Sequence, residues 1–192
     1  MNPSAGGTER SATKYNHHMK ESLVSGIRSS VAEFNAIIAG LDDGAFERNA
    51  GGKWSAGQDL QHLVRILRII NIVYALPLFI LRILFGKSDQ GSRDNHVIAK
   101  KYKEAMALAV KAPAPFVPGT VRAKERDALL SAHLQLGERL CRRIEKMSEH
   151  SLDTYRMPHP VMGKVTLREM IVLTYLHTDH HAEITKRKVG KV

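Results

Sequence analysis

Three histidines lie within about one helical turn near the end of the chain, in the segment LHTDHHAEI at residues 176–184. His177 and His181 are four residues apart, so on a helix both side chains project from one face. Imidazole nitrogens at this spacing can bind a single metal ion together. His177 and His180 also lie within one turn, so spacing alone leaves open which histidine is the second ligand.

A further histidine, His62, falls in the second turn of a helix that is predicted to begin near Ser55. Two helices that present His62, His177 and His181 to one another would form a three-histidine metal site. Three protein ligands with one open position are the pattern of catalytic zinc sites, whereas structural zinc sites use four ligands. Imidazole suits zinc, nickel, copper and iron alike, so these residues do not name the metal.

Composition indicates one globular domain. The chain has 192 residues, of which 43% are hydrophobic and 25% charged, which is enough to build a core. The single cysteine, Cys141, excludes an intrachain disulfide and favours a reducing compartment, so we expect a cytoplasmic protein with Cys141 buried as a small hydrophobe. Residues 1–13 are rich in Ser, Gly and Thr and are predicted to be a disordered lead-in to a single domain at 14–192.

The chain is basic, with a formal net charge of +10. Such a charge supports solubility and attracts anionic partners. Aromatic residues make up only 6% of the chain, and no helix-turn-helix pattern is evident, so a nucleic-acid partner is disfavoured.

Hydrophobic periodicity predicts four long helices and one short one. Apolar residues recur every three or four positions over residues 16–42, from Ser55 onward, over 121–148 and over 166–188, while 94–111 forms a shorter helix. This pattern predicts an all-α helical bundle, an architecture that builds metal sites from facing helices.

Short polar motifs mark the starts of two of these helices. Ser55 with Gln58, and Thr166 with Glu169, have the spacing of capping boxes. Trp54, just before the first box, is expected to pack as a core anchor. The remaining segments are interpreted as a loop at 44–53, an extended connector at 112–119 and a turn at 158–164.

A long apolar run at residues 69–85 resembles a membrane span at first sight. Arg68 and Arg82 bracket only thirteen uncharged residues, whereas a spanning helix needs about twenty. Pro77 should also break or kink the helix. We therefore predict no membrane span, and we expect the surplus apolar face to meet a second copy of the chain or a lipid surface.

Two stretches of the chain resemble a known family. Residues 53–63 (KWSAGQDLQHL) resemble the start of the second helix in the DinB-like superfamily, which includes the YfiT group. Residues 163–170 (GKVTLREM), followed by HTDHH at 177–181, resemble the last helix of that family. The resemblance extends over roughly residues 16–188. The long apolar segment and the short helix after it depart from the family pattern.

The resemblance implies an antiparallel four-helix bundle that is commonly dimeric, here with one short extra helix. It also implies a divalent metal, zinc or nickel in particular, bound by three histidines, which by position are His62, His177 and His181. Similar proteins include metal-dependent thiol S-transferases and hydrolases that act on small molecules. The expected function is therefore a metal-dependent transferase or hydrolase, with a low-molecular-weight thiol as one candidate substrate.

Two other classes of function stay open, a non-catalytic metal-binding dimer and a basic protein that binds nucleic acid or a membrane surface. The remaining polar residues have less specific expectations. His180 is expected beside the ligands, and Gln58 or Asp59 could orient His62. His159 is expected in a turn, with a position over the site as an acid or base as the alternative. The histidines without a visible partner are expected at the surface; these are His17, His18, His96, His133 and His150.

Overall fold

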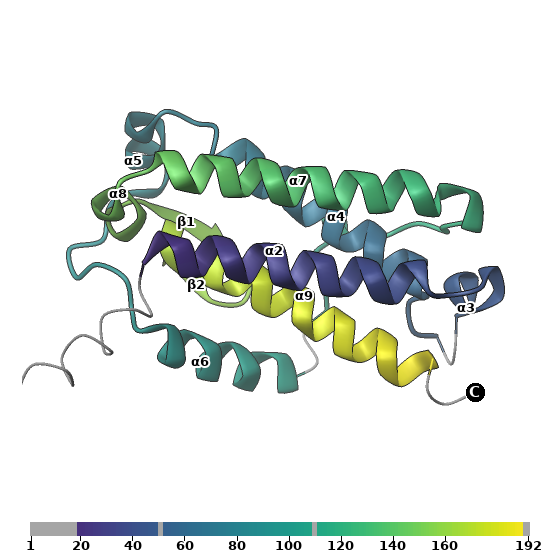
Figure 1. Ribbon diagram of the computed structural model, residues 1–192. Coiled ribbons are helices and arrows are strands. Elements are labelled where there is room, and N and C mark those ends of the chain that lie inside the picture. The colour runs from purple at the N-terminus through teal and green to yellow at the C-terminus, as the bar shows by residue number, and fades with distance from the viewer. Residues whose placement is uncertain (1–18, 50–51, 109–110, 190–192) are drawn as a thin grey trace, which may run out of the picture.

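Four long helices form the bundle that the periodicity predicts (Figure 1). They are α2 (Lys20–Ala39), α4 (Ala56–Val73), α7 (Arg126–Lys146) and α9 (Leu167–Val189). The all-α fold class is therefore confirmed. The computed structural model describes residues 19–49, 52–108 and 111–189, and the lead-in expected at 1–13 lies outside these residues.

The direction of the helices explains the long connection in the middle of the chain. Helices α2 and α9 run one way along the bundle, and α4 and α7 run the other way (Figure 1). Helix α4 packs against α7, so the chain must return along the bundle between these two parallel neighbours. The return includes α5 (Leu78–Phe85) and α6 (Asn95–Ala107), and α6 lies against α9. The predicted short helix is α6.

Both helices that carry the candidate ligands begin at the predicted capping boxes. Ser55 Oγ accepts a hydrogen bond from Gln58 N at 3.2 Å, and the Gln58 side chain accepts one from Ser55 N at 3.0 Å. Thr166 and Glu169 make the same reciprocal pair at 3.2 Å and 3.0 Å. These boxes fix where each helix starts, and therefore which residues face the bundle interior.

The apolar run is broken where Pro77 predicts. Helix α4 ends at Val73 and α5 begins directly after Pro77, because proline lacks an N–H group and its ring excludes the preceding helical turn. Within the described residues, no single helix has the length and apolarity needed to cross a membrane. Helices α4 and α5 satisfy that test only as a pair, by length and composition, and the chain bends by 107° between them.

The predicted turn at 158–164 is part of a β-hairpin. Strands β1 (Arg156–His159) and β2 (Gly163–Thr166) pair in antiparallel register. The sequence does not indicate this hairpin because Pro158 lies within β1. Proline has no N–H group to donate and is therefore tolerated only at the edge of a sheet. The two-stranded sheet offers such an edge. The hairpin leads directly into α9.

Two short helices lie outside the predicted helices. Helix α3 (Asp43–Glu47) lies in the predicted loop, and helix α8 (Glu149–Thr154) follows α7. Asp42 and Ser148 cap their first turns with side-chain oxygens. The 3₁₀ turn η2 (Ala114–Phe116) lies in the predicted connector. The 3₁₀ turn η3 (Ala123–Glu125) occupies the start of the helix predicted at 121–148, so α7 begins only at Arg126.

The expectation that His133 is a surface residue is wrong. His133 is fully buried on α7, where its Nδ1 donates to Asn35 Oδ1 at 2.7 Å and its ring packs edge-on against Phe34. Burial lowers the pKa of His133 to about 4, so the ring is neutral at pH 7. Cys141, in contrast, is buried as predicted.

The buried His133 should make stability depend on pH. Its pKa is lower in the folded chain than its ordinary value of 6.5, so the unfolded chain binds more protons between pH 6.5 and about 4. Stability is therefore lost as pH falls through that window, by up to about 1.4 kcal/mol per pH unit from this group. The free energy of unfolding, measured in urea at several pH values, should fall less steeply with decreasing pH in His133→Gln than in the parent. Equal slopes would contradict this account.

Candidate metal centre

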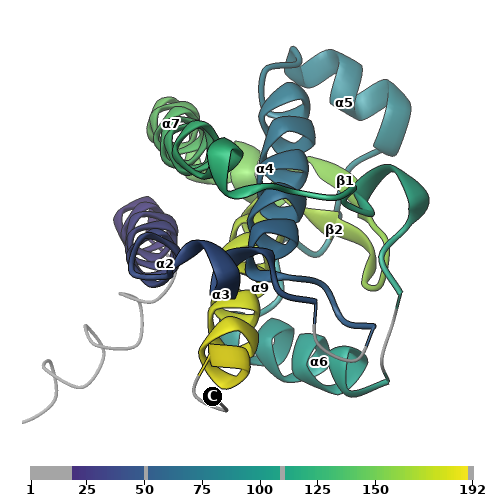
Figure 2. The same cartoon turned by 90° about the vertical axis from the view of Figure 1, so that its right-hand side faces the viewer.

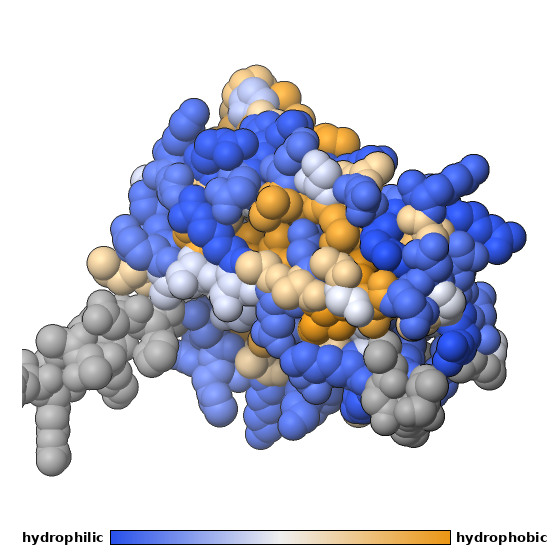
Figure 3. All heavy atoms as spheres, turned by 45° about the vertical axis from the view of Figure 1, so that its right-hand side comes forward, coloured by the Kyte–Doolittle hydropathy of each residue, from blue (hydrophilic) through white to orange (hydrophobic). Residues whose placement is uncertain are grey.

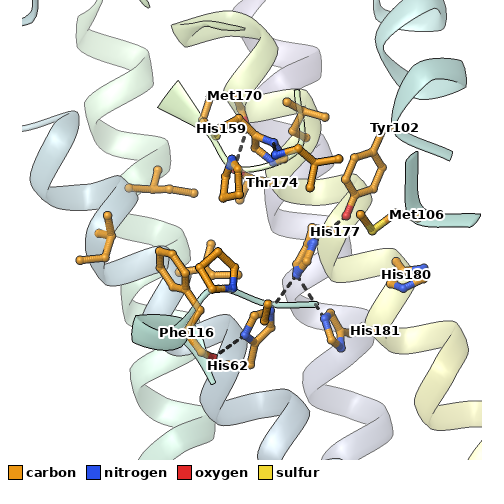
Figure 4. Close-up of a pocket in the computed structure, with 18 of the residues that line it drawn as sticks. His62, Tyr102, Met106, Phe116, His159, Met170, Thr174, His177, His180 and His181 are labelled. Atoms are coloured by element: carbon orange, nitrogen blue, oxygen red, sulfur yellow. Dashed lines mark hydrogen bonds between the residues drawn. The ribbon is translucent and has the colours of Figure 1, made fainter. Parts of the chain in front are cut away.

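His62, His177 and His181 meet between α4 and α9 (Figure 4). His177 Nε2 lies 3.0 Å from His62 Nε2 and 3.1 Å from His181 Nε2. Each of the three offers a ring nitrogen within 4.8 Å of the others. The structure thus brings together the three histidines that the sequence picks out, from helices whose residues are more than one hundred positions apart.

Helical spacing explains why these side chains converge. On α4, Asp59 and His62 are three residues apart and share one face. On α9, His177, His181 and Lys188 follow one another at spacings of four and seven, which also keeps them on one face. These two faces meet. Helix α4 therefore contributes Asp59 beside its histidine, and α9 contributes Lys188 beside its two histidines.

His180 lies beside this group and outside it. Its ring centroid is 5.7 Å from that of His181 and 6.5 Å from that of His177. Among the described residues, only His62, His177 and His181 form a group with metal-ligand spacing. His180 instead lines the adjacent cavity, as expected of a neighbour of the ligands.

The other ring nitrogen of each histidine has a hydrogen-bond partner from a different part of the chain. His62 Nδ1 donates to the Phe116 carbonyl of η2 at 2.8 Å. His181 Nδ1 donates to Asp59 Oδ1 at 3.1 Å, and His177 Nδ1 lies 2.6 Å from the Tyr102 hydroxyl of α6. Partners of this kind orient the rings of metal-binding histidines and select their tautomers.

Asp59 connects the two helices behind the histidines. Its side chain is only 2% exposed, and its second carboxylate oxygen accepts from Lys188 Nζ and from Thr185 Oγ1. Lys188 Nζ also donates to the Trp54 carbonyl at 2.7 Å. The expectation that Gln58 or Asp59 orients His62 is therefore wrong in its target, because Asp59 holds His181 and Gln58 caps α4.

The donor set fits a cation. Phe116 O accepts from His62 Nδ1, and the Asp59 carboxylate accepts from His181 Nδ1, so in the neutral form of each ring the Nε2 atom is bare. Both face His177 Nε2, which carries at most one hydrogen. In at least one of the two short contacts of His177 Nε2, two nitrogen lone pairs therefore face and repel each other unless a cation lies between them. Tetrahedral zinc would hold such nitrogens about 3.3 Å apart.

Burial keeps His62 and His177 neutral and ready to bind a metal. Burial, with His181 close by, lowers the pKa of His62 to about 4. Burial and the neighbouring histidines hold the pKa of His177 well below its ordinary range. Neutral imidazole is the form that binds metal, so protons compete little for these two nitrogens near pH 7.

A mostly apolar cavity of about 250 Å³ opens over the histidines. No carboxylate lines it within the part of the chain that the structure describes. Trp54, expected to be a core anchor, is instead only partly buried and forms one wall, with its ring 4.9 Å from that of His62. His159, at the end of β1, also lines the cavity, which agrees with the alternative of a position over the site. The apolar walls include Ile66, Ile69, Ile70, Met106, Phe116, Met157, Val161, Met170 and Leu173.

Two of these hydrogen-bond partners have no direct signal in the sequence. Tyr102 lies on α6, whose position depends on the route of the chain back along the bundle, and Phe116 contributes only its backbone carbonyl. The place of Asp59 did have a signal, because it lies one helical turn before His62 and therefore on the same face.

Tyr102 should increase metal affinity without being a ligand. Burial raises the pKa of Tyr102, so its hydroxyl stays neutral and can accept from His177 Nδ1. Tyr102→Phe is expected to weaken metal binding about tenfold at unchanged stoichiometry. Competition with a chromophoric chelator measures this affinity, and Tyr155→Phe serves as a control outside the cavity. Equal affinities in the parent and Tyr102→Phe would exclude the role.

Comparison with known proteins supports the same family that the motifs suggested. The family model of the DinB superfamily matches residues 27–185. The chain is also similar to the solved structure of YfiT from Bacillus subtilis, described as a probable metal-dependent hydrolase with an unusual four-helix bundle topology. That likeness has a TM-score of 0.59 and 14% identity and covers 99% of this chain and 94% of that one.

No curated protein matches the chain. The structural likeness, at its low identity, shows the fold, and the fold agrees with the bundle described above. The family match covers most of the chain and includes all three histidines of the cluster. The chain belongs to the DinB superfamily.

Proposed function

We propose that this protein is a metal-dependent enzyme whose divalent ion is held by His62, His177 and His181. The observation that carries the proposal is the convergence of three Nε2 atoms at one side of an apolar cavity. Zinc or nickel is the proposed metal, in line with the all-imidazole donor set. YfiT, which shares the fold, is described as a probable metal-dependent hydrolase, and that description adds support.

His62, His177 and His181 would hold the ion, and when bound it would lower the pKa of a water or thiol and so supply a nucleophile at neutral pH. The protein's own contribution is to orient and to exclude water. Asp59, Tyr102 and the Phe116 carbonyl hold the three rings in place. The apolar walls shield the reacting groups from solvent and take up the apolar part of a substrate.

Transfer of a low-molecular-weight thiol to an electrophile is the reaction that we propose first. The described cavity lining offers no carboxylate as a general base. A thiol activated by the ion needs no such base, whereas water attack usually benefits from one. Hydrolysis is the second candidate, and the description of YfiT favours it.

The two reactions can be separated with one set of protein samples. Protein loaded with zinc or nickel is incubated with glutathione, cysteine or coenzyme A and the electrophile monochlorobimane, and the fluorescent thioether is measured. Parallel samples receive p-nitrophenyl esters without thiol. Thioether formation that His181→Ala abolishes supports transfer, and ester cleavage with the same dependence supports hydrolysis. If metal removal unfolds the protein while no tested reaction depends on metal, the non-catalytic metal-binding dimer gains weight instead.

A further inference from the structure

Helix α5 presents an apolar surface that the bundle does not cover. We call Phe79, Ile83 and Leu84 the α5 face; these residues are 64%, 77% and 57% exposed. Helix α5 projects from the bundle in Figure 2, and hydrophobic side chains appear at the top of Figure 3, where α5 lies. Three large exposed apolar residues within an eight-residue helix need an explanation beyond the fold.

The inner side of α5 is well anchored, so the exposed face is a fixed feature of the fold. Leu81 is fully buried, and the helix packs against strand β1. Phe79 and Ile83 are four residues apart and therefore project from the same side of the helix. Just before the bend, Ile72 in the last turn of α4 is also 58% exposed.

The charges in the chain segment that contains the α5 face, residues 60–88, are of one sign. From residue 60 to residue 88 the chain has no aspartate or glutamate, and it has four basic residues. Of these, Arg68, Arg82 and Lys87 are exposed, and the neighbouring strand β1 adds Arg156. The nearest acidic residue along the chain is Asp89. The apolar face is thus bordered by cations in a protein whose net charge is +10.

This combination decides between the two occupants that the sequence leaves open. A two-fold pairing of α5 with α5 in a second copy would bring like surfaces together, and with them Arg82 against its own counterpart. No acidic residue on α5 itself would compensate that repulsion. An anionic lipid surface offers both an apolar layer for the α5 face and negative headgroups for the surrounding cations.

We propose that the α5 face docks on the surface of an anionic lipid membrane. Phe79, Ile83 and Leu84 enter the boundary between headgroups and acyl chains, while the side chains of Arg82 and Lys87 reach the headgroups. The bend after α4 directs α5 across the axis of that helix, so the contact is interfacial and does not span the bilayer. The proposal does not depend on the metal site.

Vesicle co-sedimentation of the full chain tests the proposal. We expect binding to phosphatidylcholine vesicles that contain about one third phosphatidylglycerol, and little binding to pure phosphatidylcholine. Phe79→Ser/Ile83→Ser should weaken binding at least about tenfold, since it removes the inserted apolar area. Arg82→Gln should weaken it about fivefold. Leu134→Ser, which removes an exposed leucine from α7, is the matched control and should bind like the parent.

Sedimentation velocity of the same variants identifies the competing occupant. If the parent is a dimer that Phe79→Ser/Ile83→Ser converts to monomers, and neither binds anionic vesicles, the α5 face covers a second copy and the proposal is wrong. Failure of the parent to bind anionic vesicles in any oligomeric state overturns it as well. So does equal weakening by Leu134→Ser. Circular dichroism verifies that each variant keeps its helices.

Discussion

Replacing His181 with alanine should reduce bound metal from about one equivalent per chain to none. Two imidazoles remain in the variant, and Asp59 loses its histidine partner, so neither the ligand count nor the arrangement of donors supports tight binding. His62→Ala and His177→Ala should have the same effect. Elemental mass spectrometry of untagged protein measures the metal, and circular dichroism follows the helices, which we expect to persist.

His180→Ala provides a control from the same helical turn. His180 lines the same cavity, but it lies outside the group with ligand spacing, so its removal should leave the metal content unchanged. Metal retention by His181→Ala, or metal loss by His180→Ala, would show that the ligand assignment is wrong. A parent that takes up neither zinc nor nickel would instead remove the basis of the proposed function.

Replacing Glu169 with alanine should cost about 3 kcal/mol in the free energy of unfolding. The carboxylate is 4% exposed and accepts hydrogen bonds from the backbone and guanidinium of Arg93, and from the Thr166 backbone in the capping box. The change would break the box at the start of α9 and leave Arg93 without this partner. Urea unfolding measures the loss.

The contact also fixes where α6 begins, so the same variant should loosen that helix. Helix α6 begins at Asn95, Asp94 caps it, and Arg93 comes directly before this cap. Hydrogen exchange at residues 95–107 should accelerate in Glu169→Ala more than exchange in α2. A double-mutant cycle with Arg93→Ala isolates the pair, and a coupling energy near zero would contradict the argument.

Acid should weaken the same contact. Burial alone would raise the pKa of Glu169, but the hydrogen bonds from Arg93 and from Thr166 outweigh it and hold the pKa below its ordinary value of 4.5. The stabilisation is therefore complete above pH 4.5 and is lost as pH falls through the lower pKa of the folded chain.

Local rules predicted much of the fold. Helix starts followed from the capping boxes at Ser55 and Thr166, and the break followed from Pro77, because each depends on a few neighbouring residues. The hairpin at 156–166 was missed because its strands are short and contain a proline. His133 was misplaced because periodicity cannot tell a buried polar residue with a distant partner from an exposed one.

In the candidate site, too, the sequence predicts some residues and not others. The histidines could be picked out from their spacing and from the resemblance to a family. Their hydrogen-bond partners lie far away in sequence: Asp59 is 122 residues from His181, and Tyr102 is 75 residues from His177. The Tyr102 pair depends on how the return segment lies across the bundle, which no local pattern contains, whereas the spacing of Asp59 from His62 indicates only the face that Asp59 shares.

The hydrogen bond from His62 to a main-chain carbonyl has an evolutionary consequence. Every amino acid has that carbonyl, so the side chain at position 116 can vary without removing the acceptor for His62. The Phe116 side chain, meanwhile, forms part of the cavity wall. A substitution at position 116 can therefore change the shape of the cavity while the hydrogen bond that orients His62 is kept. Substitutions along the return segment can therefore reshape the cavity while the three-histidine cluster is inherited unchanged.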